Sequence, residues 1–159
     1  MSPRPDLLVL AAELEDHLTR TQREVESIEE LAVGNSIDAR TLWALAGHLQ
    51  AFYTGCESLI VRALEKFDGL PPTGPDSHVR VLQQSILDIP GLRPAILNTK
   101  TAAALHPYRA FRHFFRHAYG VDLAWARMAA KVENARGVFR RFKEDIHTFT
   151  DFLKSAANS

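Results

Sequence analysis

Apolar residues recur at steps of three and four along most of the chain, a spacing typical of amphipathic helices. The first such stretch runs from Pro5 to about Val33, and its apolar positions include Leu7, Leu10, Leu14, Leu18, Val25 and Ile28. A second broad apolar face runs from Leu42 to about Phe67. Gly34-Asn35-Ser36 is expected to end the first helix and to offer a cap for the second. Helices of this length predict side-by-side antiparallel packing in a bundle.

A Gly- and Pro-rich linker, Gly69–Pro75, follows the second helix. Pro75 and Asp76 suit the first turn of a short third helix. The apolar side of that helix is predicted to contain Val79, Leu82, Ile86 and Ile89. Pro90-Gly91 is expected to stop it, and residues 92–98 are predicted to form an irregular crossing segment.

A fourth helix is predicted from Thr99 to about Ala118, with a kink or a restart at Pro107 and a left-handed stop at Gly120. Asp122 is expected to cap a fifth, which continues past Phe152. No stretch shows the alternation of a strand. The sequence therefore predicts an all-α protein, a four- to five-helix up-and-down bundle, with residues 1–159 forming a single domain.

The composition, with 46% hydrophobic and 24% charged residues, is ordinary for a soluble globular protein. The single cysteine, Cys56, excludes an intramolecular disulfide and is expected to be a small core side chain. The N-terminus shows no apolar signal-peptide core, and no run reaches membrane-spanning length. We expect a cytoplasmic protein without membrane contact.

Charge is unevenly distributed, although Lys+Arg and Asp+Glu both number 19. Between Ile89 and Val121 there is no acidic residue. The same stretch contains the basic residues Arg93, Lys100, Arg109, Arg112 and Arg116 and the histidines His106, His113 and His117. This segregation predicts a local anion-binding surface on a neutral protein.

The densest part of this surface is Arg109–Gly120, where arginines and histidines alternate with phenylalanines. Arginine suits phosphate oxygens, and histidine exchanges protons near neutral pH. Arg112 and His117 are separated by about 140° of helix rotation, so one regular helix does not place them neatly on one face. Either the helix loosens near Gly120, or a second copy of the chain supplies the partner side chains.

These residues match a known family. Arg112-x4-His117-x-Tyr119 resembles the Arg-x4-His-x-Tyr motif of HepT-type toxins in the HEPN superfamily of helical ribonucleases. His113 fits the polar residue that often follows the motif arginine. Residues 52–57 and 142–145 also look like features of one HepT-like branch. Pro107 departs from the smooth motif helix of the family.

The resemblance implies a metal-independent endoribonuclease toxin, active as a homodimer and silenced by a nucleotidyltransferase (MNT-type) antitoxin. It implies that Arg112 and His117 are the catalytic pair and that Tyr119 is the site of adenylylation. For the cleavage of RNA through its 2′-hydroxyl, we expect phosphate to be positioned by Arg109, His113 and Arg116.

Two further residues are candidates for supporting roles at the site. Glu57 is a candidate to orient Arg112 or a histidine, and Tyr53 either lines the cleft or packs in the core. We expect no cofactor and no metal, because the helical spacing of His113 and His117 has no accompanying carboxylate ligand. The phenylalanines of the motif are expected to be core contacts. No role is assigned to the isolated histidines His17, His48, His78 and His147. The alternative function is a non-catalytic HEPN-like module that binds a nucleotide or a partner protein.

Overall fold

Helices make up most of the computed structural model, which describes residues 2–34, 36–117 and 123–159. Over these residues the helices are α1 (Pro5–Ala32), α2 (Ala39–Phe67), α3 (Ser77–Ser85), α4 (Thr99–His117) and α5 (Trp125–Ala157). The described ranges contain no strand, only an isolated antiparallel bridge between Ile89 and Arg93. The predicted all-α bundle is confirmed.

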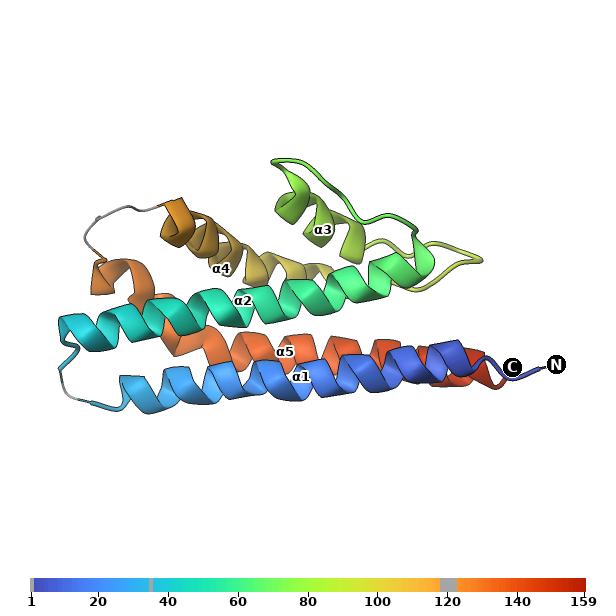
Figure 1. The fold of residues 1–159 in the computed structure, drawn as a ribbon, viewed down its shortest axis with the longest axis horizontal. Helices are drawn as coiled ribbons and strands as arrows, with labels where there is room; N and C mark the ends of the chain where they lie inside the picture. The colour runs from blue at the N-terminus through green and yellow to red at the C-terminus, as the bar shows by residue number, and fades with distance from the viewer. Residues whose placement is uncertain (1, 35, 118–122) are drawn as a thin grey trace.

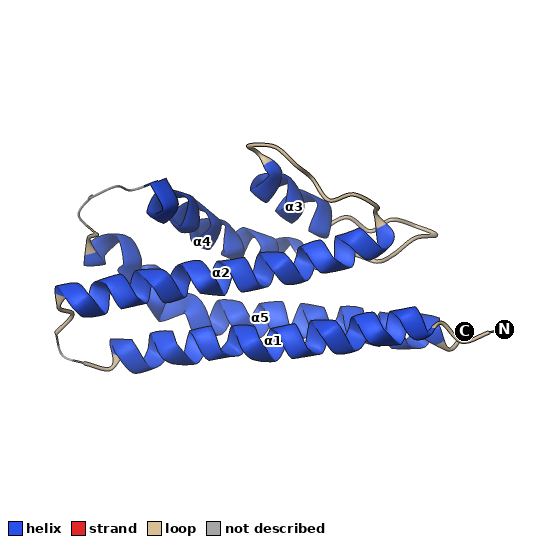
Figure 2. Ribbon diagram, viewed as in Figure 1, coloured by secondary structure: helices blue, strands red, loops and turns tan. Residues whose placement is uncertain are grey.

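Three long helices form the body of the bundle, and α1 packs against both α2 and α5 (Figures 1 and 2). The α4 helix packs on α2 and α5, while the short α3 lies against α2 and α4. The N-terminal and C-terminal ends meet, because the Arg4 amide donates to the Ala157 carbonyl at 2.9 Å. Within the ranges described, no helix combines the length and the hydropathy that a membrane span requires.

The core is built from the predicted apolar faces. Cys56 is buried on α2, as expected. The Phe52 ring makes edge contacts with Tyr108 of α4 and Phe139 of α5, at centroid distances of 5.2 and 6.3 Å. Burial of a large apolar side chain contributes about 1.5–3 kcal/mol, so aromatic contacts that join three helices stabilise the placement of α4.

Helices α1 and α2 approach closely at Gly55. A Cβ atom on Gly55 would lie 2.6 Å from the Thr21 Oγ1 atom, far inside van der Waals contact. The Thr21 hydroxyl instead donates to the His17 carbonyl at 2.9 Å. The missing side chain of Gly55 is therefore what allows this helix spacing.

Helix ends differ in detail from the sequence-based expectations. The cap of α2 is Asp38, whose carboxylate accepts from the Thr41 amide at 2.8 Å, and is not provided by Gly34-Asn35-Ser36. The α3 helix begins after Asp76 and ends four residues before Ile89. The α4 helix continues through Pro107 without a restart; a bend there stays a prediction.

The last helix, α5, begins at Trp125 with Ala124 as its N-cap. The expected cap, Asp122, lies outside the described residues, as does the expected stop at Gly120.

A buried ion pair fixes the segment around α3. The Arg93 guanidinium donates to both carboxylate oxygens of Asp68, each at 2.6 Å, and to the Leu87 carbonyl at 2.8 Å. The Arg93 side chain is 0% exposed and that of Asp68 is 5% exposed. Burial alone would raise the Asp68 pKa, but hydrogen bonds from Arg93 and Gln84 outweigh it and hold this pKa below its usual value. The prediction that Arg93 belongs to an anion-binding surface is wrong, because its charge is already paired inside the protein.

Candidate functional site

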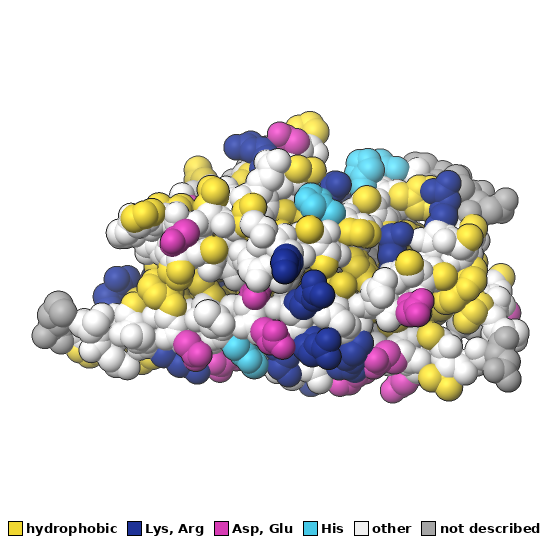
Figure 3. Space-filling view, turned by 180° about the vertical axis from the view of Figure 1, so that it is seen from behind, with side chains coloured by type: hydrophobic (Ala, Val, Ile, Leu, Met, Phe, Trp, Pro, Cys, Tyr) yellow, Lys and Arg dark blue, Asp and Glu magenta, His cyan; other side chains and the backbone are white. Residues whose placement is uncertain are grey.

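The second half of α4 turns its aromatic residues inward and its basic residues outward. Tyr108 and Phe111 are buried, and the Tyr108 hydroxyl donates to the Lys131 carbonyl of α5 at 2.7 Å. Phe114 and Phe115 are partly buried against the core, as predicted. Figure 3 shows histidine side chains beside Lys or Arg side chains on the upper right of one face, an acidic side chain at its upper edge, and a mixture of acidic and basic side chains along the lower part.

Basic residues of α4 share a pocket of about 280 Å³ with a histidine of α3. Its lining consists of His78, Arg112, His113, Arg116 and His117. One chain thus brings Arg112 and His117 to the same pocket, although they do not share a helix face. His117 is the last residue of α4.

The His117 ring is held in a defined tautomer. Its Nδ1–H donates to the His113 carbonyl at 2.8 Å, and the His113 and His117 rings lie 4.4 Å apart between centroids. Because the carbonyl can only accept, Nδ1 carries the proton and Nε2 is the nitrogen left with a lone pair when the ring is neutral. In its neutral form, His117 therefore offers Nε2 as the proton acceptor.

The Arg112 guanidinium is anchored by α2 and α3. Its Nε–H donates to the Thr54 hydroxyl at 2.9 Å, and its Nη1 lies 3.4 Å from the His78 Nε2 atom. A guanidinium has more N–H bonds than these two contacts use, so it keeps donors for an anion. This arrangement holds a fixed positive charge at the pocket.

A carboxylate–histidine pair stands behind Arg112, and sequence analysis missed its histidine. The His78 Nδ1 atom lies 2.8 and 2.9 Å from the two carboxylate oxygens of Glu57. The Glu57 side chain is 14% exposed and that of His78 is 38% exposed. His78 is isolated in the sequence, and no local pattern signals it; only the fold of α3 across α2 reveals the contact. Glu57, a predicted supporting residue, does contact a histidine, but one to which no role was assigned.

Other predicted residues lie elsewhere. The Arg109 Nε–H donates to the His106 Nδ1 atom at 3.4 Å, and Arg109 is not part of the pocket lining. Tyr53 is fully buried in the core, so it does not line the cleft. Burial, followed by the negative charge of Glu57, raises the Tyr53 pKa well above its usual value. Tyr119 lies outside the described residues, and its role stays a prediction.

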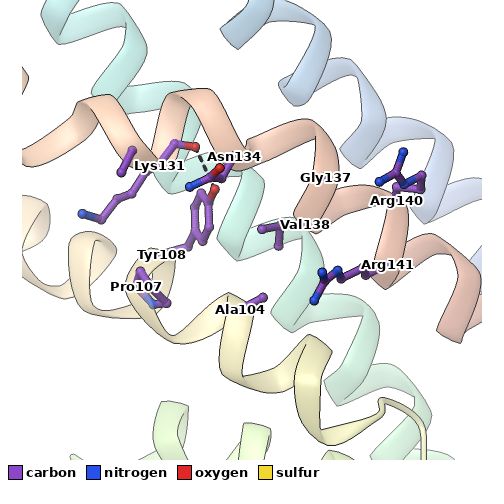
Figure 4. A pocket seen from close by; sticks show the side chains of 10 residues that line it. Ala104, Pro107, Tyr108, Lys131, Asn134, Gly137, Val138, Arg140 and Arg141 are labelled. Carbon is purple, nitrogen blue, oxygen red and sulfur yellow. Dashed lines mark hydrogen bonds between the residues drawn. The ribbon is translucent and has the colours of Figure 1, made fainter.

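A larger pocket of about 430 Å³ lies between α4 and α5 and contains none of the predicted site residues. In Figure 4, Ala104 and Pro107 of α4 lie on one side of this pocket, with Lys131 and Arg141 of α5 on the other.

The described part of the chain contains no group of three or more His, Cys, Asp or Glu side chains placed to hold a metal ion.

Fold and pocket together define an all-α bundle protein with an arginine- and histidine-lined site on its surface. The chain belongs to the HepT-like protein family, whose model matches residues 44–153. This range contains every residue that lines the pocket, and membership implies a toxin of the HEPN ribonuclease type with an antitoxin partner. Comparison with curated proteins gave no match, and neither did comparison with solved structures.

Proposed function

We propose that the protein is a metal-independent endoribonuclease toxin, silenced by a nucleotidyltransferase antitoxin. The observation that supports this most strongly is the pocket in which Arg112 and His117 stand together in a HepT-like chain. Arginine binds phosphate oxygens, and histidine transfers protons near neutral pH. RNA is the substrate because DNA lacks the 2′-hydroxyl that serves as nucleophile.

The reaction is a transesterification. The His117 Nε2 atom takes the proton of the 2′-hydroxyl, and the 2′-oxygen attacks phosphorus while the bond to the 5′-oxygen breaks. Arg112 stabilises the extra negative charge of the phosphorane-like transition state. Arg109, His113 and Arg116 position the phosphates. The products are a 2′,3′-cyclic phosphate and a 5′-hydroxyl.

The leaving 5′-oxygen requires a second proton donor. In a homodimer that apposes two α4 helices, His117 of the second protomer fills this role in a composite cleft, and water is the alternative donor.

Regulation rests on Tyr119, two residues beyond His117 in the motif. We propose that the antitoxin transfers adenylate groups to its hydroxyl. A bulky anion attached there would occupy the RNA site and neutralise Arg112 and Arg116.

Cleavage of RNA by purified protein, with and without EDTA, tests the enzyme. We expect His117→Ala and Arg112→Ala to slow cleavage by about 10²–10⁴-fold, the usual contribution of a proton-transfer or charge-stabilising group. His147→Ala is the matched control, because His147 is an exposed histidine of α5 that does not line the pocket. A 2′,3′-cyclic phosphate on the product would support the mechanism. Equal rates for wild type and His117→Ala, or an absolute need for added metal, would refute it.

A different outcome would favour the binding module. If the protein bound a nucleotide or a partner protein at this pocket and never cleaved RNA, the family resemblance would extend to the fold but not to the chemistry.

The regulatory half has its own test. Intact-mass measurement after incubation with the candidate antitoxin and ATP should show increments of adenylate that disappear in Tyr119→Phe. Increments that persist in Tyr119→Phe would show that another side chain is modified.

A further inference from the structure

The strongest unassigned feature of the molecule is a row of side chains from three different helices, Glu57 of α2, His78 of α3 and Arg112 of α4. The His78 Nδ1 atom lies 2.8 and 2.9 Å from the two carboxylate oxygens of Glu57. On the other side of the ring, the His78 Nε2 atom lies 3.4 Å from the Arg112 Nη1 atom. A histidine therefore stands between a carboxylate and the guanidinium to which charge stabilisation is assigned above.

Both neighbours of His78 require the same tautomer. An ionised carboxylate only accepts hydrogen bonds, so Nδ1 carries the proton and donates to Glu57. A guanidinium only donates, so Nε2 carries no proton and accepts from Arg112. One neutral imidazole satisfies both contacts. The Glu57 carboxylate thus fixes the ring so that an acceptor faces Arg112.

Arg112 is consequently held at two nitrogens of its planar fork. Its Nε–H donates to the Thr54 hydroxyl at 2.9 Å, and its Nη1–H points to His78. A contact at Nε alone would let the guanidinium pivot about that hydrogen bond, whereas a second contact at Nη1 fixes its plane. Neither contact uses Nη2, whose N–H groups stay available to a phosphate oxygen.

We propose that His78, oriented by Glu57, is a positioning residue that holds the Arg112 guanidinium in the plane from which it binds the reacting phosphate. The proposal rests on the ribonuclease activity proposed above. It assigns no proton transfer to His78, so the donor for the leaving oxygen stays on the second protomer or on water. The negative charge of Glu57 polarises the ring and makes Nε2 a better acceptor. At 3.4 Å the contact is long, so its contribution is orientation more than binding energy.

A purely structural role would be to anchor α3 on α2 through the pair of Glu57 and His78. Two substitutions of His78 separate the roles. The amide of asparagine reaches about as far as Nδ1, so His78→Asn keeps a donor for Glu57 but offers no acceptor to Arg112. The longer glutamine reaches about as far as Nε2, so His78→Gln offers a carbonyl to Arg112. Neither side chain can transfer a proton.

We expect His78→Asn to slow RNA cleavage by about tenfold, the effect of one lost hydrogen bond in the transition state. Its thermal unfolding midpoint should stay close to that of the wild type, because the anchor to Glu57 remains. His78→Gln should recover most of the lost rate. Equal losses in the two variants would contradict the positioning role.

A double-mutant cycle tests whether His78 acts through Arg112. In the Arg112→Ala background the guanidinium is gone, so adding His78→Asn should change the single-turnover rate by less than about twofold. A contribution that is independent of Arg112 would instead multiply with the loss from Arg112→Ala. If His78→Asn slows the Arg112→Ala variant as much as it slows the wild type, the positioning role is wrong.

The motion of Arg112 can be measured without any substrate. Rotation about the Nε–Cζ bond exchanges Nη1 and Nη2, and nitrogen-15 NMR reports its rate. We expect this rotation to be slow in the wild type and faster in His78→Asn. Equal rotation rates would overturn the proposal even if the protein cleaves RNA. If rotation depends on His78 but the wild type cleaves no RNA, the proposed function fails while the hold on Arg112 is supported.

Discussion

Replacing Arg93 by methionine removes the cation from a buried ion pair while keeping much of the side-chain volume. Asp68, with 5% of its side chain exposed, would be left as an uncompensated charge inside the protein. Breaking a buried pair in this way costs about 3–5 kcal/mol. The Leu87 carbonyl also loses its donor, which adds about 1 kcal/mol. We therefore expect Arg93→Met to lower the free energy of unfolding by about 4–6 kcal/mol at neutral pH, a large part of the stability of a typical domain.

Urea unfolding followed by circular dichroism measures this loss as a lower midpoint with an unchanged slope. The double variant Arg93→Met with Asp68→Leu is the control, because an apolar pair of similar volume leaves no buried charge and should recover most of the loss. A loss below about 1 kcal/mol for Arg93→Met would place the pair in the range of exposed ion pairs and refute the reasoning from burial.

The effect should also depend on pH. The Asp68 pKa is lowered from 3.8 in the folded wild type. Its ionised form therefore stabilises the protein at pH values above 3.8, and this contribution is lost as the pH falls through the lowered folded value. In Arg93→Met the orphaned carboxyl is buried without its cation and takes up a proton more readily. The difference between wild type and variant should be largest near neutral pH and narrow toward about pH 4.

Three further outcomes follow from helix contacts. Gly55→Ala should lower the free energy of unfolding by about 1–3 kcal/mol, measured by thermal or urea unfolding, because its Cβ would collide with Thr21. Adding Thr21→Ala should recover part of the loss. If Gly55→Ala causes no loss, α1 and α2 can move apart freely. Thr54→Val should slow RNA cleavage by about tenfold at unchanged stability, since it removes only the acceptor that holds Arg112; an unchanged rate would exclude that role. Cys56 should react with an aromatic disulfide reagent only when the protein unfolds, because burial raises the pKa of its thiol; rapid labelling of the native protein would contradict its burial.

Local pattern was enough for most of the fold. The apolar period places α1 within one residue of its observed end at Ala32 and ends α2 at Phe67, since an amphipathic face is visible within each segment. Capping was less accurate. Asp38 and not the Gly34–Ser36 turn caps α2, because the side chain that reaches a free amide depends on the path of the loop.

Only part of the site could be predicted from the sequence, because the remaining contacts depend on how distant segments fold together. Arg112 and His117 lie in one short segment, and their chemistry can be recognised there. His78 meets Glu57 across 21 positions of sequence, and Arg93 meets Asp68 across 25. Partners at such separations are set by how α3 folds back over α2. Hence one cation expected at the surface is internal, and one histidine without a predicted role lies in the pocket.

The linker between α2 and α3 separates the residues that line the pocket from residues of α2 that support them. Leu70 in this linker is 93% exposed, so a protease or a genetic break can divide the chain there. The first fragment would carry Glu57 and Asp68, and the second would carry His78 and the basic end of α4. The second fragment would carry every residue that lines the pocket, but Glu57 and Thr54, which contact His78 and Arg112, would lie in the first. If the proposed ribonuclease activity is correct, cleavage of RNA by a divided chain would require the two fragments to reassemble through the contacts of α1 and α2 with the later helices.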